Sequence, residues 1–279
     1  MGKFSDYVLV SDFDHTLTDR DGRIPASNLD AIAYFMDHGG IFTLATGRSL
    51  PTCRRRFSEV PVNAPWLLYN GGACYDPTTE QFLYCHHLPD DILPMLKELA
   101  ERYPQLRKEF HTTDAHYIFG PDSRRNDYLD SVGAKHFHVP WEEVPDPKMN
   151  FCLYSTSPNA WSMTAQCEEA QFFARLEQEI NGMSEGKILA LNSLPAMVEI
   201  QAVGVSKGRA ARDLANRLSR KTLVCAGDAI NDLSMLQEAD LAFVPADCDS
   251  RVKVHGFREA AASDEGTIAS IVAYLETFA

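Results

Sequence analysis

The chain has 279 residues, of which 45% are hydrophobic and 23% are charged, and 26 basic against 39 acidic side chains give a net charge of −13. This composition excludes a disordered or collagen-like chain and is sufficient for one large or two smaller cores. The negative charge argues against a general nucleic-acid-binding protein, because a phosphate backbone would be repelled. For the same reason, any phosphorylated ligand needs cations close to its site.

The sequence shows no sign of a membrane or secreted protein. No apolar run reaches the roughly 18 residues of a membrane-spanning helix, and residues 1–7 contain no apolar core of a secretory signal. Seven cysteines are scattered without a Cys-x-x-Cys pair. Because free thiols are typical of the reducing cytosol, we expect a cytoplasmic protein with no membrane partner.

The N-terminal part alternates strand and helix. Residues 7–10 form a short apolar run that predicts a fully buried strand. Ser27 is a predicted helix N-cap, and residues 39–40, both glycine, end that helix. Residues 41–44 (Ile-Phe-Thr-Leu) predict the next strand. This order is the start of a doubly wound, Rossmann-like α/β sheet.

The C-terminal part repeats this alternation, whereas the middle does not. Predicted elements of the C-terminal part are 198–203, 206–218, 222–225, 232–238, 241–244 and 267–278. In the middle, helices are predicted at 89–99 and 165–180, with strands at 115–119, 136–139 and 151–154. We therefore predict an α/β core in two parts, residues 1–86 and 191–279, interrupted by an inserted α+β domain over residues 87–190.

Polar residues follow the ends of the predicted strands, where open α/β sheets bind ligands. Asp12 and Asp14 come directly after the first strand, and such a pair suits a nucleophile and a general acid/base. A calcium-binding loop is excluded, because position 17 is Leu where that loop needs Gly and position 23 is Arg where it needs Glu.

Two further positions suit an anion. After the second strand, Thr46 offers a hydroxyl group, Gly47 a backbone N–H and Arg48 a positive charge, which together fit a phosphate group. Lys207 is expected in the first turn of a helix, where it opposes the helix dipole and so favours a role with an anion. Taken singly, a polar helix N-cap and a solvated surface lysine explain these two features better than an anion site does.

The segment from Gly227 to Asp232 is the most specific of these motifs. A predicted strand runs into Gly227–Asp228, and Asp232 follows at the start of a helix. Asp228 and Asp232, clustered with Asp12, would repel one another unless a hard cation lay between them. An oxygen-rich site that also faces a phosphate suits Mg²⁺.

Together and in this order, the motifs resemble those of the haloacid dehalogenase-like superfamily of aspartate-nucleophile phosphatases, and the resemblance covers nearly the whole chain. The matching residues are Asp12, Asp14, Thr16, Thr46, Lys207, Asp228, Asn231 and Asp232. More narrowly, the chain resembles the Cof-type (subclass IIB) branch, whose α+β cap is inserted between the second and third motifs. The segment 69–72 (Tyr-Asn-Gly-Gly) resembles the turn before that cap, and His15 departs from the Gly or Asn that the family more often has.

The resemblance implies a role for each residue. Asp12 attacks phosphorus and becomes an aspartyl-phosphate, while Asp14 protonates the leaving group and later deprotonates the hydrolytic water. Mg²⁺ is bound by the Asp12 carboxylate, the Asp14 main-chain carbonyl and Asp228, and Asp232 supports the metal or Lys207. Phosphoryl oxygens are held by Thr46, Gly47, Lys207 and Asn231, and further substrate contacts come from Arg48 and Asn70.

We therefore predict a Mg²⁺-dependent phosphatase for small phosphorylated metabolites, with sugar phosphates as the leading class. A phosphomannomutase-like phosphomutase on the same fold is one alternative. A catalytically idle ligand-binding protein is another, although clustered carboxylates are costly without a metal.

Other motifs carry less weight. Residues 204–208 match the Gly-x-Ser-x-Gly elbow of serine hydrolases. That function would leave Asp12 and Thr46 unexplained, so Ser206 is predicted to be a helix cap. His86–His87, and His136 with His138, suggest metal pairs, but without clustered Cys or carboxylate partners they are predicted to be surface or strand histidines. Arg124 and Arg125 are predicted to be solvated, with a grip on the far end of a substrate as the alternative.

Overall fold

The computed structural model describes residues 2–157, 166–194 and 196–278. Its contacts divide the chain into two compact units. We call residues 1–47, 56–84 and 206–279 the core unit, and residues 48–55 and 85–205 the insert unit. Within the described residues, no helix combines the length and apolar character that crossing a membrane requires.

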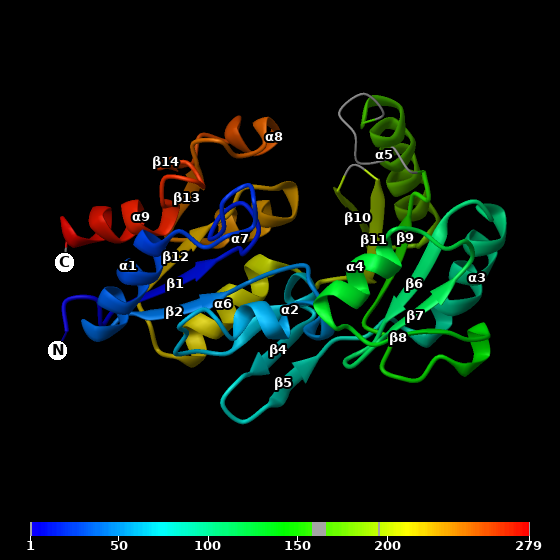
Figure 1. Ribbon diagram of the computed structural model, residues 1–279, viewed down its shortest axis with the longest axis horizontal. Helices are drawn as coiled ribbons and strands as arrows, with labels where there is room; N and C mark the ends of the chain where they lie inside the picture. Colours follow the sequence, from blue (N-terminus) through cyan, green and yellow to red (C-terminus); the bar gives the residue numbers. More distant parts are fainter. Residues whose placement is uncertain (1, 158–165, 195, 279) are drawn as a thin grey trace. The chain divides into compact units, whose positions relative to one another are not determined.

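The core unit is built on a five-stranded parallel sheet (Figure 1). The strands are β1 (Tyr7–Ser11), β2 (Ile41–Leu44), β12 (Thr222–Ala226), β13 (Leu241–Pro245) and β14 (Arg258–Ala260). Their order is β14-β13-β12-β1-β2. Its α-helices are α1 (Ala26–Asp37), α6 (Lys207–Arg217), α7 (Leu233–Glu238), α8 (Ser250–Lys253) and α9 (Thr267–Glu276).

The sheet is doubly wound, as predicted. The chain leaves β1 through α1 to β2 in one direction and leaves β12 through α7 to β13 in the other. Since such crossovers are right-handed, α1 and α7 cover opposite faces of the sheet. Val8 and Val10 of β1 belong to the apolar cluster that contains Leu214 of α6 and Met235 of α7. Burial on both faces explains why these strands are continuous apolar runs.

A smaller antiparallel sheet follows β2 along the chain, and single 3₁₀ turns occur in both units. The strands β3 (Trp66–Leu68), β4 (Ala73–Asp76) and β5 (Gln81–Cys85) form a three-stranded sheet, and α2 (Leu50–Phe57) precedes it. The 3₁₀ turns are η1 (Tyr69–Gly71), η2 (Asp90–Ile92), η3 (Trp141–Glu143) and η4 (Ile230–Asp232). The start of α1 differs from the prediction, because Pro25 takes the N-cap position and Ser27 lies inside the first turn.

The insert unit contains a six-stranded sheet in the order β10-β11-β9-β6-β7-β8. Its strands are β6 (Arg107–His111), β7 (His116–Phe119), β8 (His136–His138), β9 (Asn150–Tyr154), β10 (Ile188–Leu194) and β11 (Met197–Ala202). Its helices are α3 (Leu93–Arg102), α4 (Arg125–Val132) and α5 (Gln166–Met183). Residue 165, the predicted start of α5, lies outside the described residues.

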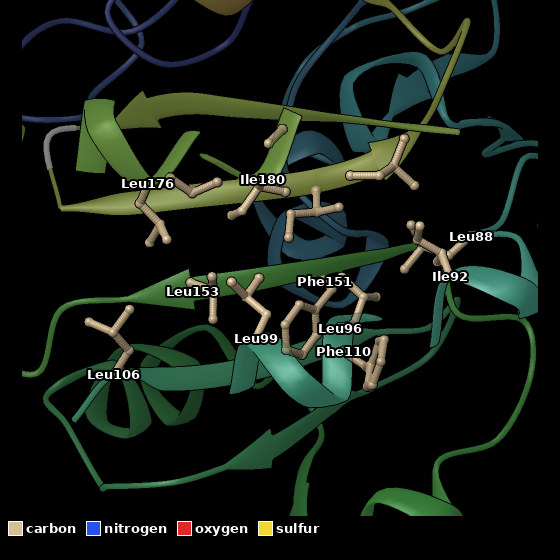
Figure 2. Close-up of a cluster of buried hydrophobic side chains, with 14 of the residues drawn as sticks. Leu88, Ile92, Leu96, Leu99, Leu106, Phe110, Phe151, Leu153, Leu176 and Ile180 are labelled. Carbon is tan, nitrogen blue, oxygen red and sulfur yellow. The ribbon is translucent and has the colours of Figure 1, made fainter. Parts of the chain in front are cut away.

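One face of this sheet packs against α3 and α5 (Figure 2). Leu96 and Leu99 of α3 and Ile180 of α5 contribute to the same buried cluster as Phe110 of β6 and Phe151 of β9. Because side chains alternate along a strand, the residues between these apolar positions face the opposite side.

The insert unit extends beyond the predicted boundary at residue 190. Residues 198–203 were expected in the core, but β11 pairs antiparallel with β9 and β10 inside the insert sheet. The reason is that Val198 and Ile200 bury their side chains in the apolar cluster of the insert unit. The insert unit therefore ends at Val205, and the core unit resumes at Ser206.

Candidate active site

Asp12 and Asp228 lie at the point where the strand order of the core sheet reverses. Asp12 follows β1 and Asp228 follows the neighbouring strand β12 after one glycine. The Asp12 amide donates to the Ala226 carbonyl at 2.8 Å, which joins the two strand ends. Carboxylate oxygens of Asp12, Asp228 and Asp232 all lie within 4.8 Å of one another. In open α/β sheets, ligands bind at this reversal, beyond the carboxyl ends of the strands.

Lys207 is fully buried and connects two of these carboxylates. Its Nζ donates to Asp12 Oδ1 and to Asp232 Oδ1, each at 2.6 Å. The lysine begins α6, whose N-cap is Ser206, with Oγ accepting from the Arg209 amide at 3.1 Å. The predicted cap is therefore confirmed. The alternative of a solvated Lys207 is wrong, because the side chain is enclosed.

Asp232 shapes the turn that carries Asp228. Its Oδ2 accepts hydrogen bonds from the backbone N–H groups of Asp228 at 3.1 Å and Ala229 at 3.0 Å. A Cβ on Gly227 would lie 2.5 Å from the Asp232 Cβ, so no other residue fits at position 227 without a shift. Since three donors already occupy the Asp232 oxygens, Asp232 acts as a positioning residue for its neighbours.

The loop after β1 is a tight turn. Leu17 and Thr18 donate backbone hydrogen bonds to the Phe13 carbonyl. Thr16 Oγ1 donates to Asp228 Oδ1 at 2.9 Å and so links this loop to the one after β12. His15 has a φ of 57°, in the left-handed region that Gly and Asn occupy most readily. This backbone conformation explains why the family that the motifs resemble more often has Gly or Asn at position 15.

The acidic cluster carries more negative charge than Lys207 balances. Burial, with the charges of Asp232 and Asp14, raises the pKa of Asp12 to about 7, against the opposing charge of Lys207. Burial, with the charges of Asp12 and Asp232, raises the pKa of Asp228 to about 8. Oxygen donors that repel one another in a buried place are the setting that a hard divalent cation relieves. The residues present therefore fit Mg²⁺.

Metal-free protein is expected to lose stability between about pH 4 and pH 8. Folding raises the pKa of Asp228 from 3.8 to about 8, so its contribution to stability is complete below pH 3.8 and disappears as the pH passes 8. Calorimetry in EDTA should show a Tm that falls over this range, and Mg²⁺ should raise it most at high pH. Asp228→Asn should flatten the profile in EDTA. Identical Mg²⁺ responses at pH 5 and pH 8 would contradict this view.

The predicted phosphate-binding residues after β2 adjoin the same edge. Ala45 continues the pairing of β2 with β1, because its backbone N–H donates to the Ser11 carbonyl at 2.8 Å. Thr46 and Asp12 therefore follow the ends of two neighbouring strands at the same edge of the sheet. The Thr46 carbonyl oxygen accepts a hydrogen bond from the backbone N–H of Asn70 at 2.9 Å. A Cβ on Gly47 would approach Asn70 Oδ1 to 3.0 Å, so the glycine makes room for this side chain.

Asn70 joins this loop to the one that follows β12. Its Oδ1 accepts from Asn231 Nδ2 at 3.1 Å. Asn70 lies in a turn with a φ of 52°, followed by Gly71 with a φ of 91°, where a Cβ would meet the Ser206 carbonyl oxygen at 2.3 Å. The turn thus packs closely against the start of α6. Arg48, by contrast, falls in the insert unit, where it donates to the hydroxyl of Tyr128 on α4.

The sequence prediction overlooked a second cluster of ionisable side chains, in the insert unit. Glu109, His111 and His116 are buried with ligand atoms within 4.8 Å of one another. The prediction of surface or strand histidines is confirmed, since His86 and His87 are exposed and His136 and His138 lie on β8. The alternation of Arg107, Glu109 and His111 along one strand was the available signal for the buried cluster.

Known proteins match most of the length of this chain. The family model of haloacid dehalogenase-like hydrolases matches residues 9–271. A 5-amino-6-(5-phospho-D-ribitylamino)uracil phosphatase from Bacillus subtilis is 22% identical over 250 residues, covering 88% of this chain and 86% of its own. The HMP-PP phosphatase of Yersinia enterocolitica is 28% identical over 242 residues, covering 84% and 81%.

Solved structures share the whole fold. A haloacid dehalogenase-like hydrolase from Bacteroides thetaiotaomicron has a TM-score of 0.79 at 19% identity, over 96% of this chain and 99% of its own. A sugar phosphatase of subclass IIB has a TM-score of 0.78 at 18% identity, over 98% of both chains. From the match to the family model and this common fold, the chain belongs to the haloacid dehalogenase-like hydrolase family.

Proposed function

We propose that this protein is a Mg²⁺-dependent phosphatase of small phosphomonoesters, with sugar phosphates as the leading substrate class. The observation that carries the proposal is the buried Asp12, held by Lys207 beside Asp228 where the strand order reverses. The Bacillus and Yersinia relatives are named phosphatases of small phosphorylated compounds, which supports the same reaction class here.

The proposed reaction has two steps at one carboxylate. Asp12 attacks phosphorus, the ester P–O bond breaks, and Asp14 gives its proton to the leaving oxygen. Asp14 then removes a proton from water, which attacks phosphorus, cleaves the aspartyl-phosphate and releases inorganic phosphate. Lys207 keeps the Asp12 carboxylate oriented and offsets its charge in the buried site.

Binding of the phosphoryl group is assigned to groups at the same edge of the sheet. Asp12, the Asp14 main-chain carbonyl and Asp228 would hold Mg²⁺, which supplies positive charge to the phosphoryl oxygens. Thr46, Gly47, Asn231 and Lys207 are the proposed further contacts. They provide hydroxyl, backbone N–H, amide and ammonium groups, all of which can donate hydrogen bonds to phosphate oxygens. This local field would offset the net charge of −13.

The cysteines support a reducing compartment, and we propose the cytoplasm. The free thiols with described side chains are Cys53, Cys74, Cys85, Cys152, Cys225 and Cys248. Burial raises the pKa of the Cys225 and Cys152 thiols well above their ordinary value, which makes them poor nucleophiles.

The test is phosphate release from a panel of phosphorylated sugars, polyols and nucleosides, with Mg²⁺ and with EDTA. We expect release to depend on Mg²⁺ and to fall at least ~100-fold in EDTA, because the cation carries several kcal/mol of charge stabilisation. Isomerised sugar phosphate without free phosphate would replace the proposal with a mutase. Full activity in EDTA would contradict the metal-dependent mechanism.

A further inference from the structure

Asn28 is a fully buried asparagine in the first turn of α1. Its Nδ2 donates to the Leu17 carbonyl oxygen at 2.9 Å, and its Oδ1 accepts from the backbone N–H of Ala269 at 3.0 Å. Asparagine is seldom enclosed in this way, because a buried amide needs partners for its donor and for its acceptor. These partners lie 11 residues before Asn28 and 241 residues after it, so one side chain joins three segments of the core unit.

The contact with Ala269 supports the start of α9. The N-cap of this helix is Gly266, which has no side chain to accept the first N–H groups of the helix. Asn28 Oδ1 supplies such an acceptor from α1. A Cβ on Gly266 would lie 2.5 Å from Ser27 Oγ, so the glycine allows α9 to begin close beside α1 (Figure 1). This half of the Asn28 side chain has a structural role.

The contact with Leu17 acts on the turn that carries Asp14. The Phe13 carbonyl oxygen accepts the Leu17 N–H at 3.2 Å, which closes the turn over residues 14–16. Leu17 is therefore bonded in two directions. Its N–H returns to the start of the turn, and its carbonyl oxygen accepts from Asn28 on α1.

The backbone of this turn needs support from outside. His15 has a φ of 57°, in the left-handed region, which costs an L residue free energy and persists where surrounding contacts hold it. Thr16 joins the turn to Asp228 at 2.9 Å, and Asn28 joins it to α1. If the bond to Asn28 is lost, the turn can relax and move Asp14 with it.

We infer that Asn28 is a positioning residue that holds the turn of Asp14 and so places the Asp14 carboxyl group for protonation of the leaving group. The inference rests on the proposed function, in which the leaving oxygen takes the Asp14 proton while its P–O bond breaks and the bond from Asp12 to phosphorus forms. A general acid must lie within hydrogen-bond reach of that oxygen, and a misplacement of about 1 Å can cost ~100-fold in rate.

Asn63 offers a matched control in the same unit. Its Nδ2 donates to the Gly40 carbonyl oxygen at 3.0 Å, and its Oδ1 accepts from the Phe42 N–H at 2.8 Å. Asn63→Ala therefore removes the same two kinds of hydrogen bond as Asn28→Ala. The partners of Asn63 lie at the amino end of β2, whereas Asp14 follows the carboxyl end of the parallel strand β1. Because Asn63 is exposed, each comparison uses a ratio measured within one protein.

The first experiment follows the turn without turnover. Residue-resolved hydrogen exchange is measured on the full chain, and protection of the Leu17 and Thr18 amides, both bonded to the Phe13 carbonyl, is divided by that of the β1 amides. In Asn28→Ala this ratio should fall about 3- to 10-fold, as expected for one lost hydrogen bond. In Asn63→Ala it should keep the wild-type value. An unchanged ratio in Asn28→Ala overturns the inference, whether or not the protein is a phosphatase.

The second experiment tests Asp14 through the leaving group. An alkyl phosphate needs a proton on its leaving alkoxide, whereas p-nitrophenyl phosphate releases a phenolate that needs none. For the best alkyl phosphate of the panel, Asn28→Ala should lower kcat/KM ~100-fold, and for p-nitrophenyl phosphate less than ~10-fold. The ratio of the two values does not depend on the fraction of enzyme that is folded, and Asn63→Ala should leave it unchanged.

A double-mutant cycle shows whether Asn28 acts through Asp14. Asp14→Asn removes the acidic proton and should by itself lower the alkyl-to-aryl ratio of kcat/KM. Adding Asn28→Ala to it should lower the ratio no further. If Asn28→Ala yields no folded protein, Asn28→Ser takes its place, since its hydroxyl group is one bond short of both partners and should shift the ratio in the same direction.

The outcomes separate the positioning role from the proposed function. A lower ratio in Asn28→Ala, with no further fall in the double variant, supports the positioning role. An equal loss for both substrates, or a fall that multiplies with that of Asp14→Asn, overturns it and leaves Asn28 as a structural link between α1 and α9. If wild type releases phosphate from no ester while the exchange result is as expected, the proposed function is contradicted and Asn28 is supported as the residue that holds this turn.

Discussion

Asp12→Asn should abolish phosphate release, with a fall in kcat of at least ~10⁴-fold. An amide has nearly the shape of the carboxylate but cannot act as the nucleophile. Its oxygen can still accept from Lys207 Nζ, which lies 2.6 Å from Asp12 Oδ1 in the structure, so the fold should persist. Phosphate release under single-turnover conditions with Mg²⁺ measures the effect.

The matched control for this variant lies at the other end of β1. Asp6 is an exposed aspartate whose side chain pairs with Lys221 at 2.9 Å. Asp6→Asn removes one negative charge without touching the site and should retain full activity. Acid quenching should trap a phosphorylated enzyme in wild type and in Asp6→Asn, but not in Asp12→Asn. If Asp12→Asn retained activity within tenfold of wild type, the aspartyl-phosphate mechanism would be ruled out.

Glu109→Ala should destabilise the insert unit by about 3–5 kcal/mol, because it leaves the guanidinium groups of Arg107 and Arg125, which donate to Glu109, without their counter-charge. The substitution also removes the acceptor of both histidine N–H groups, at 3.1 Å for His111 and 2.9 Å for His116. Hydrogen exchange of the β6 and β9 amides reports this unit separately, which matters because two units need not unfold together.

A comparison within the same unit separates burial from charge. Glu142 forms an ion pair with Lys97 at 2.7 Å, but both side chains are about half exposed or more. Glu142→Ala should leave the exchange rates of β6 and β9 unchanged, since exposed pairs contribute little. Equal protection in Glu109→Ala and Glu142→Ala would show that the buried network does not stabilise the sheet.

The core sheet could be predicted because its strands are buried on both faces. The apolar runs of β1, β2, β12 and β13 stand out in the sequence for that reason, and the polar residues that follow them are brought to one edge by parallel pairing. The burial of Lys207 could not be predicted with the same ease. It depends on Asp12 and Asp232, which lie far from it in the sequence.

The insert sheet was harder to predict for the opposite reason. Residues 107–111 (Arg-Lys-Glu-Phe-His) have the polarity of a loop, yet β6 is entirely buried. Glu109 on this strand is bonded by partners that a sequence pattern does not reveal, namely Arg125 on α4 and His116 on β7. The insert unit ends at Val205 and not at the predicted residue 190, because β11 has the apolar character of a core strand but pairs with β9.

The strand arrangement of the core unit also sets the moment at which the protein can begin to work. The strand that carries Asp12 emerges from the ribosome before its neighbour β12, which is separated from it by about two hundred residues of later synthesis. Lys207, Asp228 and Asp232 belong to that late segment. At the usual pace of translation, the insert unit has time to fold first. A nascent chain therefore carries Asp12, the proposed nucleophile, for many seconds before Lys207, Asp228 and Asp232 are made, and the site is complete only once this late segment has been added.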